Sequence, residues 1–247
     1  MKLIDTFKSP NFNERKAKQQ LSYLVLHYTA IVSCQEALEY MCKRKNKVSA
    51  HFLVSKKGEV FYLVDLNKEA WHAGQSYWKG LINLNSSSIG IEIENSGHHI
   101  YNEDYNHLQI QSLCDLIKKL SKEYKIKQQD ILGHSDIAPF RKIDPGEKFP
   151  WNQLNKKKLC YLPSIDRKTL LKESKKRTKN YEYERNSKVL LMLGSIGYDV
   201  RKVKKKDKKF KLLIQAYQRH YRQSDVLGKI DIETIKLISK HYKDILT

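Results

Sequence analysis

Three side chains that could hold a metal ion lie on short apolar runs or after them. His27 belongs to the run Tyr23–Tyr28, His134 follows Ile131–Gly133, and Asp144 comes ten residues after His134. Two imidazoles and a carboxylate form the ligand set of a catalytic zinc ion, which keeps its fourth position for water. The spacing alone leaves an alternative open, because a histidine in an apolar strand is commonly a hydrogen-bonded core residue. The sequence has no HExxH pair, so it holds no helix-borne zinc site of that type.

The runs that carry these residues predict a sheet with helices beside it. Tyr23–Tyr28 is rich in β-forming residues and predicts a buried central strand, and Ile131–Gly133 predicts a short one that ends in a loop from His134 to Trp151. The alternation in Ile89–Glu94 places the isoleucines on one face and Glu92 and Glu94 on the other. Further expected elements are a hairpin (Ala50–Ser55 and Val60–Leu63, turning at Lys56–Glu59) and two helices (Cys34–Lys45 and Glu103–Tyr124). The apolar face of the second helix is expected to comprise Leu108, Ile110, Leu113, Leu116, Ile117 and Leu120.

The last third of the chain predicts a separate helical domain. The apolar pattern collapses between Leu162 and Arg185 into KESKKRTKNYEYER, which has the composition of a linker. Three helical patterns follow, at Val189–Leu193, Phe210–His220 and Ile232–Ile245. The fold class expected is α/β, with a mixed central sheet flanked by helices over residues 1–164, a basic linker over 165–185 and a small three-helix domain over 186–247. A chain ending near Asp166 is then expected to fold alone.

Charge is the strongest signal in the composition. The 47 basic and 27 acidic residues give a net charge of +20. Residues 165–247 hold 23 basic and 10 acidic residues, a net charge of +13, and residues 1–164 a net charge of +7. A basic tail can attract nucleic acid, anionic lipid or an acidic wall polymer, or can simply be a solvated surface. Charge therefore selects no partner by itself, and no nucleic-acid-binding motif accompanies it.

Cysteine usage and hydropathy argue against a disulfide-rich protein and against a membrane-spanning one. The four cysteines form no CxxC pair, so a disulfide framework is not expected and buried thiols are. No apolar run approaches the ~20 residues that span a bilayer. The N-terminal stretch MKLIDTFKSPNFNERKAKQQ lacks the apolar segment of a secretory signal.

Five blocks of sequence together resemble a known family. They are LVLHYTA (24–30), VSAHFLV (48–54), EAWHAG (69–74), SIGIEIEN (88–95) and GHSDIAPFRKIDPGEKFPW (133–151). In this order they resemble the zinc-dependent N-acetylmuramoyl-L-alanine amidases of the type-2 amidase family, which share their fold with animal peptidoglycan recognition proteins. The segments LLMLGSIGYDV, AYQRHYR and LGKIDIETIKLI resemble a peptidoglycan-binding domain of three helices. The combination most resembles the AmiD-like branch of the family.

The resemblance implies a role for each matching residue. His27, His134 and Asp144 match the zinc ligands, which implies one Zn²⁺ per chain, Glu92 matches the catalytic acid/base and Lys142 a lysine that stabilises the oxyanion. Some relatives place a tyrosine where this chain has Ala50 and lack the strand glutamate. Because this chain has the glutamate and lacks the tyrosine, proton transfer should fall to Glu92; Glu94 lies on the same face but does not match.

Four further residues are candidates for binding substrate. Trp71 and His72 are expected to line the groove or to pack in the core, and His51 to line the groove or to be structural. Arg141 is expected to hold a carboxylate of the stem peptide or to be solvated. In the helical domain the side chains of Tyr217, His220 and Tyr221 form either an aromatic platform for sugars or one face of the core.

Two classes of function follow from the resemblance. The first is an amidase that cuts peptidoglycan or muropeptides between the lactyl group of N-acetylmuramic acid and L-alanine. The second is a recognition protein of the same fold that binds muropeptides without catalysis, but such a protein would not need His27, His134, Asp144 and Glu92 together. A wall-binding domain favours the cell envelope, or periplasm, as the location, whereas an N-terminus without a signal leaves the cytoplasm open.

Overall fold

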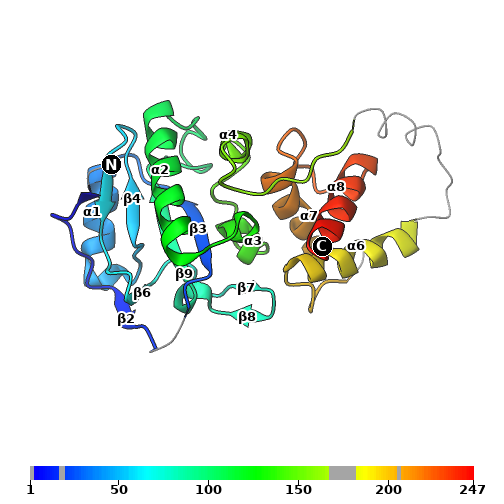
Figure 1. The fold of residues 1–247 in the computed structure, drawn as a ribbon, viewed down its shortest axis with the longest axis horizontal. Helices are drawn as coiled ribbons and strands as arrows, with labels where there is room; N and C mark the ends of the chain where they lie inside the picture. Colours follow the sequence, from blue (N-terminus) through cyan, green and yellow to red (C-terminus); the bar gives the residue numbers. More distant parts are fainter. Residues whose placement is uncertain (1–2, 17–19, 167–181, 205–206) are drawn as a thin grey trace.

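The computed structural model describes residues 3–16, 20–166, 182–204 and 207–247 (Figure 1). The strands are β1 (Leu3–Ile4), β2 (Phe12–Glu14), β3 (Tyr23–Tyr28), β4 (Phe52–Val54), β5 (Val60–Tyr62), β6 (Lys68–Ala70), β7 (Tyr77–Trp78), β8 (Leu81–Ile82), β9 (Ser88–Ile93) and β10 (Ile131–Gly133). The helices are α1 (Cys34–Cys42), α2 (His107–Tyr124), α3 (His134–Ile137), α4 (Trp151–Lys156), α6 (Glu182–Ile196), α7 (Lys208–Tyr221) and α8 (Ile232–Asp244). Short 3₁₀ turns cover Arg44–Asn46, Leu84–Ser86 and Gln128–Asp130.

A mixed sheet of six strands, in the order β1-β5-β4-β9-β3-β10, forms the centre of the fold. Strands β4, β9, β3 and β10 run parallel to one another, and the antiparallel β4–β5 pair is the expected hairpin. β3 is buried over its first five residues, as is usual for a parallel strand covered on both faces. The predicted mixed central sheet is confirmed.

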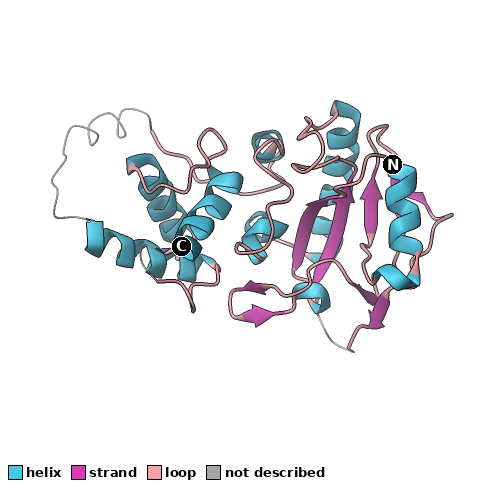
Figure 2. Ribbon diagram, turned by 180° about the vertical axis from the view of Figure 1, so that it is seen from behind, coloured by secondary structure: helices cyan, strands magenta, loops and turns pink. Residues whose placement is uncertain are grey.

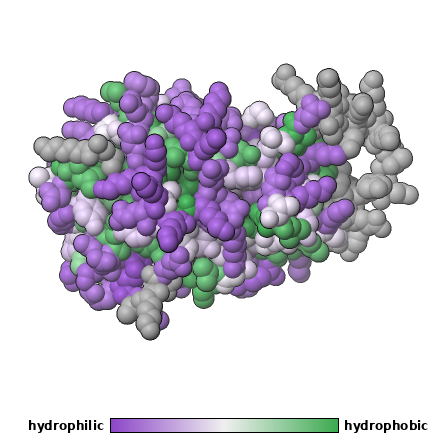
Figure 3. All heavy atoms as spheres, viewed as in Figure 1, coloured by the Kyte–Doolittle hydropathy of each residue, from purple (hydrophilic) through white to green (hydrophobic). Residues whose placement is uncertain are grey.

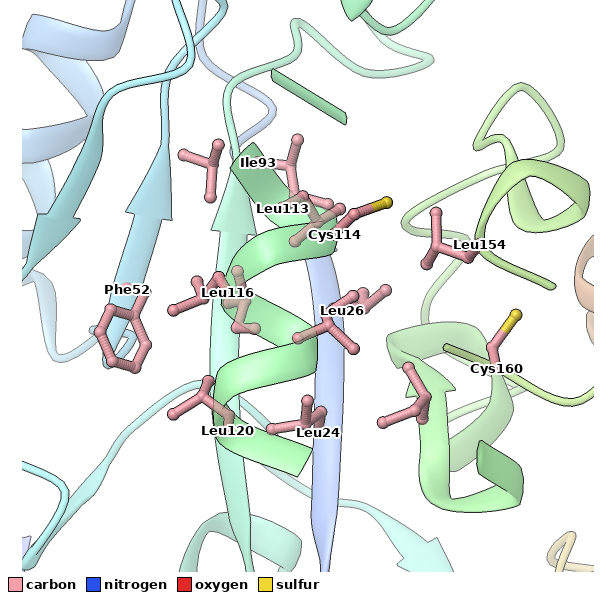
Figure 4. Close-up of a cluster of buried hydrophobic side chains, with 14 of the residues drawn as sticks. Leu24, Leu26, Phe52, Ile93, Leu113, Cys114, Leu116, Leu120, Leu154 and Cys160 are labelled. Atoms are coloured by element: carbon pink, nitrogen blue, oxygen red, sulfur yellow. The ribbon is translucent and has the colours of Figure 1, made fainter. Parts of the chain in front are cut away.

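Helix α2 covers one face of this sheet (Figure 1). Asn106 caps its N-terminus by accepting a hydrogen bond from the backbone N–H of Leu108 at 2.9 Å, so the helix begins later than the predicted Glu103. Figure 4 shows the apolar side chains of α2, among them Leu113 and Leu116, lying against those of β3, such as Leu26. Leu108 is 49% exposed, so its placement on the buried face was wrong; the other five predicted positions are buried.

The opposite face of the sheet is covered in two parts. Helix α1 packs through Ala37, Leu38 and Met41 over the β4–β5 end (Figure 2) and ends at Cys42, three residues before the predicted end. The helices α6, α7 and α8 and the short α3 lie toward the β3–β10 end (Figure 1). The side chains of His27 and Glu92 belong to this face of the sheet, between the two covers.

The C-terminal helices share a hydrophobic core with the sheet. One cluster joins Tyr23, Val25 and Leu132 of the strands to Leu213 and Tyr217 of α7. The C-terminal helices therefore pack directly on the sheet, while the predicted domain boundaries at residues 164 and 186 stay predictions. Helix α6 begins at Glu182, inside the predicted linker, and the linker residues 167–181 lie outside the described part of the chain.

The aromatic side chains predicted as a possible sugar platform belong to this core. Tyr217 is 0% exposed, His220 3% and Tyr221 8%. The Tyr221 ring stacks on that of His220, lies tilted against that of Tyr217 and meets that of His241 edge-on. The core alternative for these residues is correct, and the platform is excluded.

The cysteines, the hydropathy of the helices and the character of the surface complete the description of the fold. All four cysteines are free; Cys114 and Cys160 are buried and Cys34 and Cys42 only partly so. No helix in the described part of the chain has the length and apolarity needed to cross a bilayer. Hydrophilic side chains cover much of the face shown in Figure 3.

Candidate active site

His27, His134 and Asp144 meet at the end of the central strands. The Nδ1 atoms of the two histidines are 2.9 Å apart, and Asp144 Oδ2 lies 3.1 Å from His27 Nδ1 and 3.0 Å from His134 Nδ1. All three side chains are buried, and one donor atom from each fits within 4.8 Å of the others. The topology explains the meeting, because β10 pairs with β3 and places Gly133 beside Leu26. The next residue along the chain is a histidine in both cases, His27 within β3 and His134 directly after β10.

The short helix α3 carries His134 and the loop after it carries Asp144, and a hydrogen bond joins these two segments. The N–H of Ser135 donates a hydrogen bond to the carbonyl of Asp144 at 2.9 Å. A Cβ atom on Gly133 would lie 2.8 Å from Pro145 Cδ, so only glycine lets these loops approach so closely. The segment from His134 to Trp151, predicted as a loop, begins with the short helix α3, and His134 is the first residue of that helix.

A chain of hydrogen bonds fixes the tautomer of His27. The Ser88 hydroxyl donates to the carbonyl of Leu84 at 2.6 Å, and it accepts from His72 Nε2 at 3.1 Å. His72 Nδ1 is then the acceptor for His27 Nε2–H, at 3.0 Å. The Nδ1 lone pair of His27 consequently faces the cluster, where a metal ion needs it.

His134 is oriented in the same way by a backbone group. Its Nε2–H donates to the carbonyl of Ala73 at 3.1 Å, which leaves the Nδ1 lone pair facing the cluster. The NH2 group of Arg141 donates to the same carbonyl at 2.9 Å and to that of Gln75 at 2.8 Å. Arg141 thus braces the loop that orients His134. Its contact with a carboxylate of the stem peptide stays a prediction.

The charges of the cluster suit a cation. Burial, together with the neighbouring His134, lowers the pKa of His27 to about 4, so its imidazole is neutral at pH 7. Burial by itself raises the pKa of Asp144, but the two imidazoles facing its carboxylate hold that pKa far below its ordinary value. A neutral imidazole on His27 and a carboxylate on Asp144 are protonation states that metal binding demands.

Glu92 lies beside the cluster with an unused oxygen. His27 and Glu92 are register partners in β3 and β9, so their side chains leave the sheet on the same face. Glu92 Oε2 is buried and has no hydrogen-bond partner among the described residues. Burial first, and then the charge of Asp144, raises the pKa of Glu92 well above its ordinary value, whereas the ammonium of Lys142 lowers it. The same ammonium lowers the pKa of His27, so Lys142 lies within electrostatic reach of both groups.

Glu94 follows directly after β9, which ends one residue before the predicted end of the strand, and its side chain has a different role from that of Glu92. Its carboxylate accepts hydrogen bonds from the backbone N–H of Cys34 at 3.0 Å and of Lys56 at 2.7 Å. It joins the start of α1 to the hairpin turn and has no recorded contact with the histidines. The geometry therefore separates the two glutamates that the sequence places on one face.

Two predicted groove residues lie beneath the site. His51 is 0% exposed, accepting from the N–H of Gly90 at 3.0 Å and donating to the carbonyl of Lys68 at 3.2 Å. His72 is 6% exposed, and a Cβ on Gly90 would lie 2.3 Å from its ring, so the glycine makes room for it. For both residues the groove-lining prediction is wrong. Trp71 is partly exposed, and its contact with substrate stays a prediction.

Sequence reasoning missed the partners that hold the cluster. Ser88 and the carbonyl of Ala73 act through hydrogen bonds that no residue pattern reveals. A second omission is a row of polar groups beside Asp144: Tyr28 Oη lies 3.1 Å from His98 Nδ1, and His98 Nε2 lies 2.9 Å from a carboxylate oxygen of Glu147. Glu147 lies within the block GHSDIAPFRKIDPGEKFPW. The length of this block was a signal that residues other than His134 and Asp144 also contribute to the site.

Comparisons with known proteins show the family of the chain. The family described as N-acetylmuramoyl-L-alanine amidase matches residues 17–147. AmiD of Escherichia coli (strain K12) is 34% identical over 230 residues, covering 88% of this chain and 81% of the relative; AmpD of Haemophilus influenzae is 34% identical over 164 residues, covering 59% and 87%. The solved structure of E. coli AmiD with a substrate has a TM-score of 0.79 at 30% identity, over 95% of this chain and 98% of that one. AmpDh3 of Pseudomonas aeruginosa has a TM-score of 0.80 at 28% identity over the whole of both chains. The chain belongs to the N-acetylmuramoyl-L-alanine amidase family.

Proposed function

We propose that this chain performs the amidase reaction of its family with one zinc ion held by His27, His134 and Asp144. The observation that supports this most is the buried cluster itself, with two Nδ1 lone pairs and one carboxylate oxygen facing a common point. The donor set of two imidazoles and one carboxylate is that of catalytic zinc sites. Zinc bound there would lower the pKa of a coordinated water to about 7 and polarise the scissile carbonyl.

The proton transfers fall to Glu92. A neutral amide needs a base to activate water and an acid to protonate the leaving amine. Glu92 Oε2 has no hydrogen-bond partner in the described ranges, and the pKa of Glu92 is raised, so this carboxyl can accept a proton from water and return it to the amine of L-alanine. Glu94 is unsuited to the task because both of its oxygens hold backbone N–H groups.

Lys142 supplies positive charge at the same place. Its ammonium acts electrostatically on both His27 and Glu92, so it is near the point where the carbonyl oxygen of the substrate would develop negative charge. A fixed cation at such a point favours the transition state over the ground state.

The substrate class follows from the relatives. The structure of E. coli AmiD is described as a complex with anhydro-N-acetylmuramic acid-L-Ala-D-gamma-Glu-L-Lys, and one of P. aeruginosa AmpDh3 as a complex with anhydromuramic pentapeptide. We infer that this chain also takes muropeptides, and that the bond it cuts joins the lactyl carbonyl of the muramic acid to L-alanine. A non-catalytic receptor is disfavoured because the ligand set and Glu92 are complete.

The test is the identity of the products. The purified full chain should release anhydro-N-acetylmuramic acid and the free peptide from an anhydro-muropeptide, as identified by mass spectrometry. A chelator should stop the reaction, and zinc should restore it. Cleavage elsewhere in the peptide, or an intact substrate after incubation with zinc-loaded protein, would exclude the proposed reaction.

A further inference from the structure

We propose that the C-terminal helices set the position of the metal-binding turn, and that Tyr198 and His220 are positioning residues of the active site. The ligand turn is defined here as residues 133–138, which comprise Gly133, α3 and Ala138. The helical unit is defined as the described residues from 182 onward. The inference rests on the proposed metal site, because it concerns how firmly His134 is held for the ion.

A single buried carboxylate connects the two parts. Asp136 is 0% exposed and lies two residues after His134. Its Oδ2 accepts hydrogen bonds from the N–H of Gly133 and from His220 Nδ1, both at 2.7 Å, and its Oδ1 accepts from Tyr198 Oη at 2.6 Å. Asp136 therefore closes the ligand turn on itself with one bond and fastens it to the helical unit with two.

The two donors are held by aromatic rings of the amidase part. The His220 ring stacks on Trp151 with centroids 3.6 Å apart and an angle of 19° between the planes. The Tyr198 ring meets Trp78 edge-on, with centroids 4.9 Å apart. All four side chains are buried, so neither donor can turn away to water. Packing of the His220 ring on Trp151 and of the Tyr198 ring on Trp78 thus fixes the direction of each hydrogen bond to Asp136.

Packing of the helical unit against the sheet would not by itself need hydrogen bonds to Asp136. Tyr217 packs in the same shared core with its hydroxyl buried and without a hydrogen-bond partner among the described residues, which shows that a ring suffices for contact. Tyr198 and His220 instead direct donors at one carboxylate, and loss of either leaves a buried acceptor partly unsatisfied.

A displaced turn would also disturb the second loop. The N–H of Ser135 binds the carbonyl of Asp144, so movement of α3 is transmitted to that ligand as well. A missing bond at Asp136 should therefore alter two of the three ligands, and the metal should report the change.

The decisive comparison is Tyr198→Phe with Tyr217→Phe, each in the full chain. Both remove one buried hydroxyl from the helical unit, but only the first removes a bond to Asp136. The readouts are zinc affinity from chelator competition and the visible absorption of the cobalt-substituted protein, measured where circular dichroism shows both variants folded. We expect Tyr198→Phe to bind zinc about tenfold more weakly, the lower end of the range for groups that orient ligands, and to change the cobalt spectrum. Tyr217→Phe should match the wild type in both.

A second pair of variants tests His220 independently. His220→Asn keeps an N–H donor near the position of Nδ1, whereas His220→Leu removes it. Zinc affinity should be retained better in the asparagine variant. Wild-type affinity and cobalt spectrum in Tyr198→Phe would overturn the inference and leave the contact merely structural, whether or not His220→Leu folds. Failure of the wild-type chain to bind either metal would instead overturn the proposed metal site.

Discussion

His27 and Glu92 are register partners in neighbouring parallel strands, so a proposed metal ligand and a carboxyl whose Oε2 has no partner among the described residues leave the sheet side by side. This pairing follows from the order and the register of the two strands and needs no loop to create it. The other two ligands arrive from α3 and the loop after it, where hydrogen bonds and close packing are needed to fix them. The sheet thus places the proposed base, and the segments after β10 complete the proposed metal site.

Substitution of Glu92 in β9, and of Glu94 just after it, should separate catalysis from stability. Glu92→Gln removes the group that moves the proton, so kcat should fall by roughly 10²–10⁴-fold while zinc content stays at the wild-type level. Glu94→Gln weakens the acceptor of two backbone N–H groups and should mainly lower the melting temperature. Turnover of a soluble muropeptide and elemental analysis measure both. A larger loss of kcat in Glu94→Gln would show that the proton is handled by the other carboxyl.

His72 should matter to the metal although it cannot touch it. His72→Phe keeps a ring in the space above Gly90 but removes the acceptor for His27 Nε2–H, so zinc affinity should fall by about 10–100-fold. The matched variant His51→Phe removes a buried histidine that is bonded to the backbone and should leave zinc affinity within about threefold of the wild type. Chelator competition gives both values. Equal affinities in the two variants would refute the orienting role.

Acid should destabilise the chain partly through His241. Burial, followed by the neighbouring His220, lowers the pKa of His241 from 6.5 to about 3. Above pH 6.5 the ring is neutral in both states; as the pH falls from 6.5 to 3, the unfolded chain binds a proton that the folded chain does not, and stability falls.

His241→Phe should therefore reduce the loss of unfolding free energy over this range by up to ~1.4 kcal/mol per pH unit. His241 Nδ1 has no partner among the described residues, so the substitution sacrifices no hydrogen bond there. Urea unfolding at pH 7, 6 and 5 measures the slope. The control is His107→Phe at an exposed position, which should follow the wild type. Parallel slopes in His241→Phe and the wild type would contradict the assignment.

A chain ending at Asp166 should not behave as an independent domain. It would expose an apolar surface that includes Val25, Trp78, Leu132 and Ile137, and it would leave Asp136 without two of its donors. We expect a lower melting temperature and aggregation on concentration, measured by calorimetry and size-exclusion chromatography. A monomeric truncated chain with the melting temperature and kcat of the full chain would show that the shared core is dispensable.

The sequence predicted the strands and helices whose apolar residues recur at regular spacing. Alternation in Ile89–Glu94 and the apolar run Tyr23–Tyr28 specify strands whose pairing places Glu92 beside His27. The sequence could not predict that His72 passes beneath the site, because this depends on space left by a glycine on another strand. Likewise, a helical face holding Tyr217 and His220 is apolar whether it meets sugar or protein, and only the tertiary contact decides.

The central claim is that His27, His134 and Asp144 hold one zinc ion. It is tested most directly by elemental analysis of the purified full chain beside its Asp144→Ala variant, with circular dichroism confirming that both are folded. The account predicts one zinc ion per wild-type chain and far less than one in the variant, since a site of three ligands that loses its carboxylate binds the ion weakly. Stoichiometric zinc in the folded Asp144→Ala variant, or none in the wild type supplied with zinc, would contradict it.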